Sequence, residues 1–309
     1  MKMPVTKWIQ ILLNRNEYGN KYLPSKKGKV NAEYYPILNV GDVLAPVIVE
    51  WMLSRQKIDT TKQLSSTKHL ISVGSVISHC LYDTTVWGSG VLKEFYFIRI
   101  ITQRIFFGRK MDFRAIRGPV SRNIVRSAGY SCPEVYGDPA VLMPIIFPID
   151  RDSVKTKYNV SIVLHHRTAI AENMPDNKAA YRIGISSKDI EKYGIHFIDP
   201  KTDDYRFFIS ELVSSKLVIS SSLHGIILAE AYGIPTVFLN WGVDDQLIKF
   251  NDWYFSTGRQ TKGHPAIREA LNAAPMPLPD LRSMRSALLR SFPYDLWESD
   301  ALSVKQERN

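Results

Sequence analysis

The segment with the clearest chemical potential is Ser220-Ser221-Ser222-Leu223-His224-Gly225. A buried strand is predicted before it, over residues 217–220, and an apolar helix after it, over residues 223–232. The first N–H groups of a helix lack partners within the helix and carry the positive end of its dipole, so a phosphate or carboxylate can bind there. Serine hydroxyls can cap the helix or add donors, and an imidazole in the first turn can transfer a proton. The segment therefore predicts an anion site with His224 as its acid or base.

A second candidate pair, His165 and His166, follows a predicted strand over residues 160–164. Neighbouring side chains of an extended backbone point to opposite faces, so we expect at most one of the two to reach a cleft. A metal would need more ligands than these, and Asp244 and Asp245 fall in a loop without a predicted position. We therefore expect no required metal.

The elements that must position these residues alternate along the chain. Apolar, β-branched runs predict strands, and longer periodic runs predict helices. The predicted strands are 69–73, 84–87, 113–116, 160–164, 195–198, 217–220 and 236–239, and the predicted helices include 43–53, 119–127, 203–216 and 223–232. We expect Asp42 to cap the first of these helices and Phe207 to point inward from the third. The alternation is typical of parallel sheets covered by helices, whose ligands bind at the carboxyl ends of the strands.

A proline-rich stretch over residues 144–150, followed by charged residues, predicts an exposed linker. We expect an N-terminal Rossmann-like domain on the acceptor side over 1–147, a C-terminal Rossmann-like domain on the donor side over 148–275, and a helical segment over 276–309. The predicted fold class is α/β, with two Rossmann-like domains facing a cleft in a GT-B-like arrangement.

Composition limits the kinds of partner. A net charge of +10 favours anionic partners: phosphorylated substrates, an anionic bilayer surface or nucleic acid. Because no nucleic-acid-binding module is recognisable, nucleic acid ranks last. The basic, aromatic segment 93–117 could lie against anionic lipid headgroups, or be partly buried with its arginine tips in solvent.

Location follows from several absences in the sequence. The chain shows no signal peptide and no apolar run long enough to span a bilayer, so we expect a cytoplasmic protein, with peripheral contact at the inner face of the plasma membrane as an option. Cys80 and Cys132 cannot form a disulfide framework, and we interpret both as small buried hydrophobic residues in a reducing compartment.

Several short blocks resemble the polysaccharide pyruvyl transferase family in order and spacing, over about residues 39 to 240. The blocks are Asn39-Val40-Gly41-Asp42, Trp87-Gly88-Ser89-Gly90, Arg117-Gly118-Pro119-Val120-Ser121, Gly137-Asp138-Pro139-Ala140, Leu164-His165-His166, and Ser222-Leu223-His224-Gly225 followed by Gly233-Ile234-Pro235. Two positions depart from the family pattern, because many members have Arg where Ser222 stands and Asp where Gly118 stands. If that Arg holds a donor anion, another cation must do so here, and Arg117, Arg122 and Arg167 are the candidates.

The resemblance implies transfer of a carboxyethylidene group from phosphoenolpyruvate to two hydroxyls of one sugar, which forms a pyruvate ketal on an exopolysaccharide, capsular or cell-wall glycan. It implies no cofactor besides this donor substrate, and an acceptor that could be lipid-linked. His224 is expected to be catalytic. The expected donor-binding residues are Arg117, Ser220, Ser221, Ser222, Leu223, Gly225, His165, His166 and Arg167. The acceptor-side or structural motif residues are Asn39, Gly41, Asp42, Gly88, Ser89, Gly90 and Asp138.

Three other functions stay open from the sequence. A nucleotide-sugar glycosyltransferase of the same two-domain architecture is the strongest rival, since a helix N-terminus beside a cleft suits a diphosphate as well. A non-catalytic glycan- or lipid-binding module would use the basic surface itself. A nucleic-acid binder is the third.

Overall fold

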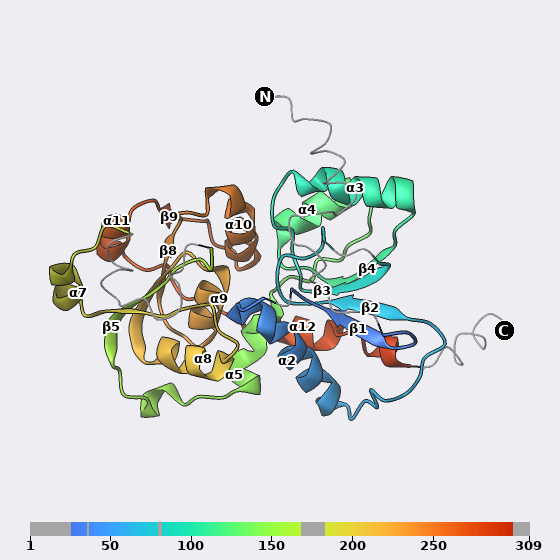
Figure 1. Ribbon diagram of the computed structural model, residues 1–309, viewed down its shortest axis with the longest axis horizontal. Coiled ribbons are helices and arrows are strands. Elements are labelled where there is room, and N and C mark those ends of the chain that lie inside the picture. The colour runs from blue at the N-terminus through green and yellow to red at the C-terminus, as the bar shows by residue number, and fades with distance from the viewer. Residues whose placement is uncertain (1–25, 36, 80–81, 168–182, 299–309) are drawn as a thin grey trace.

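Two fully parallel sheets form the framework of the protein (Figure 1). The computed structural model describes residues 26–35, 37–79, 82–167 and 183–298. The first sheet has the order β1-β2-β3-β4 and the second the order β6-β5-β7-β8-β9. The strands are β1 (Val30–Glu33), β2 (Lys68–Ile71), β3 (Thr84–Trp87), β4 (Met111–Ala115), β5 (Tyr158–Val163), β6 (Ile195–Phe197), β7 (Ser215–Ser220), β8 (Thr236–Leu239) and β9 (Gly263–His264). The predicted α/β class with two parallel sheets is confirmed.

Helices connect and cover the strands, as parallel pairing requires. The helices are α2 (Val40–Arg55), α3 (Tyr96–Phe107), α4 (Pro119–Ser127), α5 (Met143–Ile146), α7 (Ser187–Tyr193), α8 (Tyr205–Val213), α9 (Leu223–Ala231), α10 (Leu247–Ser256), α11 (Ile267–Asn272) and α12 (Arg282–Ser291), with short 3-10 turns η1 (Pro139–Leu142), η2 (Arg151–Ser153), η3 (Asp244–Gln246) and η4 (Tyr294–Trp297). All four residues of β3 and of β8 are buried, as expected for strands with helices on both faces.

The register of the second sheet positions the site. Val163, the last residue of β5, pairs with Ser220, the last residue of β7. The loops that follow these two strands therefore start side by side, and the amide of Ser221 donates to the carbonyl of Val163 at 3.0 Å. This brings the residues after β5 next to the strand–helix turn at 220–223.

One of the hydrophobic clusters is shared by the two halves. Helix α2 of the first half contributes Leu44 and Ile48, and α8 and α9 of the second contribute Phe208 and Ile227. After α11 the chain returns to the first half through α12, as Figure 1 shows. There the indole Nε1 of Trp87 donates to the carbonyl of Leu288 at 3.0 Å, which ties α12 to β3. Domain limits after residues 147 and 275 stay a prediction.

Two local predictions are wrong, and one helix was not predicted. Helix α2 begins at Val40 with Asn39 as its N-cap, so Asp42 lies inside the first turn and does not cap the helix. The side chain of Phe207 is 61% exposed, because the buried face of α8 is formed by its neighbours. Helix α10 was not expected, since Lys249 and Asp252 interrupt its apolar pattern.

Two other expectations concern the cysteines and the bilayer. Cys132 is buried, as predicted, and burial raises the pKa of its thiol to about 12. Cys80 lies outside the described residues. Among the helices of residues 26–35, 37–79, 82–167 and 183–298, none combines the length and apolar character needed to cross a membrane.

Candidate active site

A cleft lies between the two halves, where the carboxyl ends of strands from both sheets meet. It encloses about 770 Å³ of space between the two halves, part of which is open solvent. The first half lines it with Tyr35, Ile37, Asn39, Asp42, Gly74, Ser75, Val76, His79 and Leu92, and the second with His165, His166, Arg167, Ser222, Leu223, His224, Gln246 and Lys249. The position agrees with the ligand sites of other parallel α/β sheets.

His224 occupies the first turn of α9, and its ring lies against the backbone of Gly41 in the first turn of α2. A Cβ atom at Gly41 would lie only 2.6 Å from Cγ of His224 and nearer still to Nδ1. Nε2 of His224 lies 3.6 Å from Oδ2 of Asp138, and neither atom has a hydrogen-bond partner among the described residues. The other oxygen of Asp138 accepts from the amide of Ala140 at 3.0 Å. Residues from three of the sequence blocks thus meet around one imidazole, with a carboxylate able to orient its proton.

Of the three adjacent serines, Ser222 alone lines the cleft. It is the N-cap of α9, and its Oγ accepts from the amide of Gly225 at 3.4 Å. Ser220 is fully buried: its Oγ donates to the carbonyl of Val163 at 3.0 Å and accepts from the amide of Ser222 at 3.0 Å. Ser221 is also fully buried, and its Oγ accepts from the amide of His165 at 2.8 Å. These two serines fasten the ends of β5 and β7 together and so fix the shape of the turn.

Gly225 belongs to the same turn but does not line the cleft. A Cβ there would lie 2.5 Å from Oγ of Ser220, so the first turn of α9 can pack this closely only without a side chain. We infer that the glycine permits the approach of the helix to the strand end.

His165 and His166 both line the cleft, so the expectation that at most one would do so is wrong. Strand β5 ends at Val163, and the alternation of an extended backbone no longer applies in the turn beyond it. The two rings lie 4.3 Å apart. Burial, with Lys249 and other cations close by, lowers the pKa of both, that of His166 to about 4. Both are therefore neutral near pH 7 and offer hydrogen bonds without positive charge.

Asp42 is the titratable carboxylate of the first half that lines the cleft. Burial raises its pKa to about 6, although a hydrogen bond from Asn39 and the nearby His224 and Lys249 oppose the shift. Nδ2 of Asn39 donates to Oδ2 of Asp42 at 2.5 Å. A carboxyl group with a pKa near neutrality is suited to accept or release a proton during a reaction.

Lys249 and Gln246 also line the cleft, and the sequence reasoning did not identify them. The side chain of Lys249 is 6% exposed, and its Nζ donates to Oε1 of Gln246 at 2.7 Å. Burial, with Arg117 and Arg167 nearby, lowers the pKa of Lys249 to about 7. The sequence signal that could have identified Lys249 is a lysine within the mostly apolar segment that forms α10. A charged side chain in such a segment is costly to bury unless it has a partner or a function.

Arg117 lies behind the cleft wall and is fully buried. Its Nε lies 3.2 Å from Oδ2 of Asp252, its Nη1 donates to Oγ of Ser75 at 2.5 Å, and its Nη2 donates to the carbonyl of Val91 at 2.8 Å. A Cβ at Gly90 would lie 2.7 Å from Nε of Arg117. The guanidinium therefore supports the cleft-lining Ser75 and couples the first half to α10 in the second.

The other two candidate cations, Arg167 and Arg122, differ in whether they reach the cleft. Arg167 lines the cleft. Arg122 pairs with Glu134 at 3.0 Å, and its Nε donates to the carbonyl of Cys132 at 3.1 Å, both within the first half. Of the three arginines considered for the donor anion, Arg167 is the one that faces the cleft.

The remaining block residues shape the loops around the site. Oγ of Ser89 donates to the carbonyl of Gly74 at 2.9 Å, which holds a cleft-lining loop. Gly88 has a φ of +86°, and a Cβ there would lie 2.6 Å from Cγ of Pro139. Its conformation and this close approach both require glycine.

Asp252 takes over the capping of α4, whose N-cap Gly118 has no side chain. Oδ1 of Asp252 accepts from the amide of Ser121 at 2.9 Å, and Oδ2 accepts from its hydroxyl at 2.5 Å. A Cβ at Gly118 would lie 2.6 Å from Oδ1 of Asp252. The glycine at this position therefore makes room for a carboxylate from the other half.

The last features of this region are its possible metal ligands and the carboxylates of the loop after β8. Within the described part of the chain, no group of three or more His, Cys, Asp or Glu side chains could hold a metal ion. Asp245 forms an ion pair with Lys93 at 2.7 Å, across the junction of the two halves.

Several known proteins and one family are similar to this chain. The profile of the family described as "Polysaccharide pyruvyl transferase" matches residues 84–242, just over half of the chain. Uncharacterized protein L143 of Acanthamoeba polyphaga mimivirus is 25% identical over 224 residues, which are 70% of this chain and 70% of that protein. Succinoglycan biosynthesis protein ExoV of Rhizobium meliloti is 27% identical over 151 residues, 48% of this chain and 42% of ExoV. Among solved structures, an alpha-glucosyltransferase in complex with UDP and a 13-mer DNA aligns over 90% of this chain and 97% of its own at 10% identity, with a TM-score of 0.29, below the level of a shared fold.

Proposed function

This chain belongs to the polysaccharide pyruvyl transferase family, and we propose that it transfers a carboxyethylidene group from phosphoenolpyruvate to two hydroxyls of one sugar in a glycan. The observation that carries the proposal is the position of His224. It lies in the first turn of α9, inside a cleft shared by both halves, beside Asp42 and close to Asp138. The cleft thus combines an anion-binding helix end with groups that can move protons.

The proposed reaction has two additions at the same carbon of the donor. One sugar hydroxyl adds to the enol carbon, and its proton is balanced by a proton delivered to the methylene, which becomes a methyl group. The carbon–oxygen bond to phosphate then breaks, and the second hydroxyl attacks the resulting cation. Its proton leaves with the phosphate, so the products are a cyclic ketal and inorganic phosphate. Each step needs a proton donor or acceptor at the reacting carbon.

The cleft residues suggest how these roles divide. The N-terminus of α9, with the amides after Ser222, suits the phosphate or carboxylate of the donor. Arg167 adds a positive charge, and the neutral His165 and His166 add hydrogen bonds. We assign His224 to proton transfer, with Asp42 as its partner acid or base.

The direct test compares His224→Ala with the wild type and with His264→Ala, a histidine of the edge strand β9 outside the cleft. Each protein is incubated with phosphoenolpyruvate and a panel of free and lipid-linked glycans, and the products are searched for a mass gain of one carboxyethylidene group. We expect His224→Ala to lose roughly 10²- to 10⁴-fold in rate while its circular dichroism and Tm stay close to those of the wild type. Near-normal turnover by this folded variant would rule out the assignment.

The same panel separates the strongest rival. A nucleotide-sugar glycosyltransferase would transfer sugar from a sugar nucleotide, and it would release no phosphate from phosphoenolpyruvate. Turnover with sugar nucleotides alone would replace our proposal with that function.

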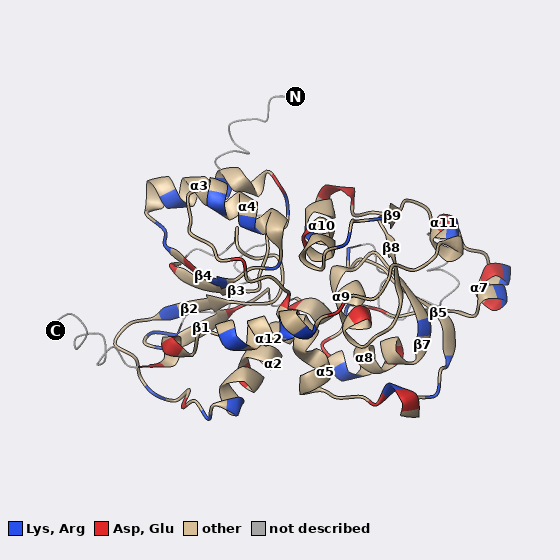
Figure 2. Ribbon diagram, turned by 180° about the vertical axis from the view of Figure 1, so that it is seen from behind, with Lys and Arg blue, Asp and Glu red and all other residues tan. Residues whose placement is uncertain are grey.

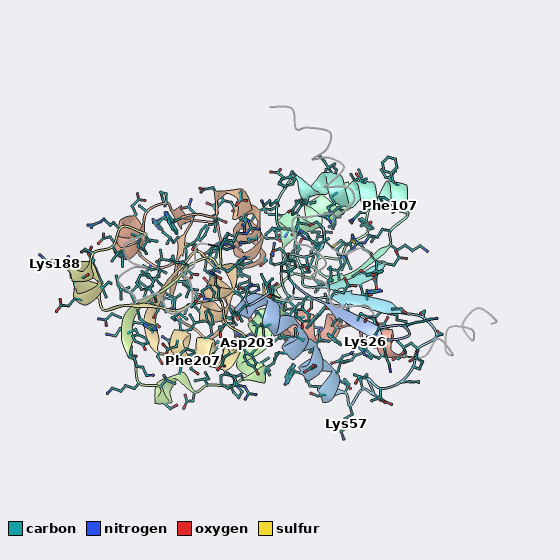
Figure 3. The ribbon with its side chains drawn as sticks, in the orientation of Figure 1. Lys26, Lys57, Phe107, Lys188, Asp203 and Phe207 are labelled. Carbon is teal, nitrogen blue, oxygen red and sulfur yellow. The ribbon has the colours of Figure 1, made fainter. Side chains whose placement is uncertain are left out.

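For location, we propose a cytoplasmic enzyme that contacts an anionic membrane through the end of α3. Ile105, Phe106 and Phe107 are 66%, 77% and 66% exposed. Figure 3 shows Phe107 projecting from the surface, and Figure 2 shows basic residues, coloured blue, along α3 and α4. Exposed aromatic residues next to the exposed Arg104 and Lys110 match a surface of anionic headgroups.

The rest of the basic segment is not available for such contact. Arg99, Arg109 and Arg117 are buried, and β4 is part of the first sheet. The partly buried interpretation holds for these residues, and the proposed membrane contact is limited to the exposed end of α3.

A further inference from the structure

We propose that Lys249 is the centre of an oxyanion site in the cleft, where its ammonium and the N-terminus of α9 together hold one anionic group of the ligand. The inference deepens the proposed function, in which that group is the phosphate or the carboxylate of phosphoenolpyruvate. No sequence block includes Lys249, and it lies on a helix that the sequence did not predict.

The first argument is the missing counter-ion. Moving an ammonium group out of water is costly unless a carboxylate or another anion compensates it. Arg117 and Arg259 follow this rule, since Arg117 lies 3.2 Å from Asp252 and Arg259 lies 2.7 Å from Glu230. The buried guanidinium of Arg109, outside the cleft, is held by the neutral oxygens of Tyr82 and Gln103. Lys249 is 6% exposed and lines the cleft, but no carboxylate of the described residues lies within 4.0 Å of its Nζ. Its hydrogen bond goes to the neutral amide of Gln246.

The second argument is position. Lys249 lines the same cleft as Ser222, Leu223 and His224, the residues at the start of α9. Helix α9 has nine residues, so its first N–H groups carry a substantial dipole. Lysine acts as a compact point charge with three donors and is a common phosphate ligand. One donor is used by Gln246, which leaves the others for a ligand in the cleft.

The surrounding charges support an anion as the missing partner. Burial and the positive charges of Arg117 and Arg167 lower the pKa of Lys249 to about 7, while Asp245 and Asp42 oppose this shift. The adjacent His165 and His166 are neutral near pH 7 and do not compete as cations. A bound oxyanion would favour the charged ammonium and raise its pKa. The ammonium form of Lys249 would therefore be favoured when an oxyanion binds beside it.

A purely structural role for Lys249 predicts a different response to mutation. If the lysine served mainly to fix Gln246, replacing it would destabilise the fold and leave anion binding intact. If the role of Lys249 is to bind an anion, Lys249→Met removes an uncompensated buried charge and preserves the length and much of the volume of the side chain. The unliganded variant should then be at least as stable as the wild type, although it has lost a hydrogen bond.

The experiment uses the full chain with Lys249→Met, and with Lys188→Met as the matched control. Lys188 is exposed on α7, far from the cleft (Figure 3). Isothermal titration calorimetry measures the binding of phosphoenolpyruvate, inorganic phosphate and pyruvate, and thermal unfolding measures the Tm of each unliganded protein. We expect Lys249→Met to weaken phosphoenolpyruvate binding roughly ten- to hundredfold, with a Tm equal to or above that of the wild type. Lys188→Met should match the wild type in both measurements.

The single-group ligands identify which anion the lysine holds. Loss of affinity for inorganic phosphate assigns it to the phosphate, and loss for pyruvate assigns it to the carboxylate. Binding of phosphoenolpyruvate by Lys249→Met within twofold of the wild type, or a clear fall in its Tm, would overturn the inference while leaving the proposed function in place. If the wild type binds phosphate in a Lys249-dependent way but not phosphoenolpyruvate, the anion site stands and the proposed function fails. Binding of none of the three ligands by the wild type would reject both.

Discussion

Replacing Gly41 by alanine is expected to disable the enzyme although the change adds only one methyl group. Gly41 lies in the first turn of α2, and the ring of His224 lies directly on its backbone. In an ordinary helix the substitution would stabilise the protein by up to about 1 kcal/mol. At this position the new methyl group has to occupy the space of the imidazole.

The size of the effect follows from the geometry. The added Cβ would lie 2.6 Å from Cγ of His224, and closer to Nδ1. Carbon–carbon contacts need about 3.5 Å, so the ring must move by about 1 Å or rotate into the cleft. Misplacement of a reacting group by about 1 Å can cost roughly a hundredfold in rate. Overpacking costs about 1–3 kcal/mol, which the helix propensity of alanine partly offsets, so we expect a net loss of stability below about 2 kcal/mol.

The assay is phosphate release from phosphoenolpyruvate in the presence of an accepted glycan, together with urea unfolding. Gly41→Ala is measured alone and in combination with His224→Ala. Once the ring has been removed, the methyl group no longer meets it. Gly41→Ala should then raise the free energy of unfolding of the His224→Ala protein by up to about 1 kcal/mol, the opposite sign to its effect in the wild type.

Two results would refute this reasoning. One is a Gly41→Ala enzyme that releases phosphate at a rate within about threefold of the wild type. The rate would then not depend on the position of the His224 ring as strongly as the geometry predicts. The other is the same destabilisation by Gly41→Ala with and without the imidazole, which would mean that Gly41 and His224 do not act on each other.

Three further predictions follow from the buried charges and the exposed end of α3. Asp252→Asn leaves the buried guanidinium of Arg117 uncompensated and should lower the free energy of unfolding by about 3–5 kcal/mol in urea titration; a loss below about 1 kcal/mol would show that the pair does not couple the halves. Folding lowers the pKa of Lys249 from 10.5 to about 7, so between these pH values the folded state binds fewer protons than the unfolded state. The free energy of unfolding of the wild type should therefore rise with pH between about 7 and 10.5, and that of Lys249→Met should lack this rise. Equal slopes for both proteins would contradict the prediction. The double variant Phe106→Ser, Phe107→Ser should bind vesicles that contain phosphatidylglycerol about tenfold more weakly than the wild type, and sedimentation with these vesicles and with pure phosphatidylcholine vesicles would detect it; unchanged sedimentation would remove the membrane proposal.

Part of the fold could be read from the sequence because its signals are local. The bounds of β3, α4 and β8 agree with those predicted, since β-branched runs, a proline at a helix start and a following glycine act on neighbouring residues. The turn from β7 into α9 was predicted for the same reason. The order of the sequence blocks identified the family.

Other features were hidden because they depend on which segments meet. Helix α10 carries Lys249 and Asp252, whose buried charges break the apolar periodicity that predicts a helix. Arg117 was expected to bind a donor anion, a role that stays a prediction, and its observed partners come from several segments, one of them in the other half. No pattern within a short window contains this information.

The sequence by itself determined the parallel α/β class, the strand–turn–helix segment at residues 220–225 and the presence of His224 in its first turn. Only the tertiary structure decided that Gly41 would support the imidazole, that Ser220 and Ser221 would face the core, and that Lys249 would stand in the cleft. The physical reason is that backbone preferences and hydrophobic periodicity act between near neighbours. The environment of a polar side chain is set by close packing between distant segments, whose placement a single local pattern does not specify.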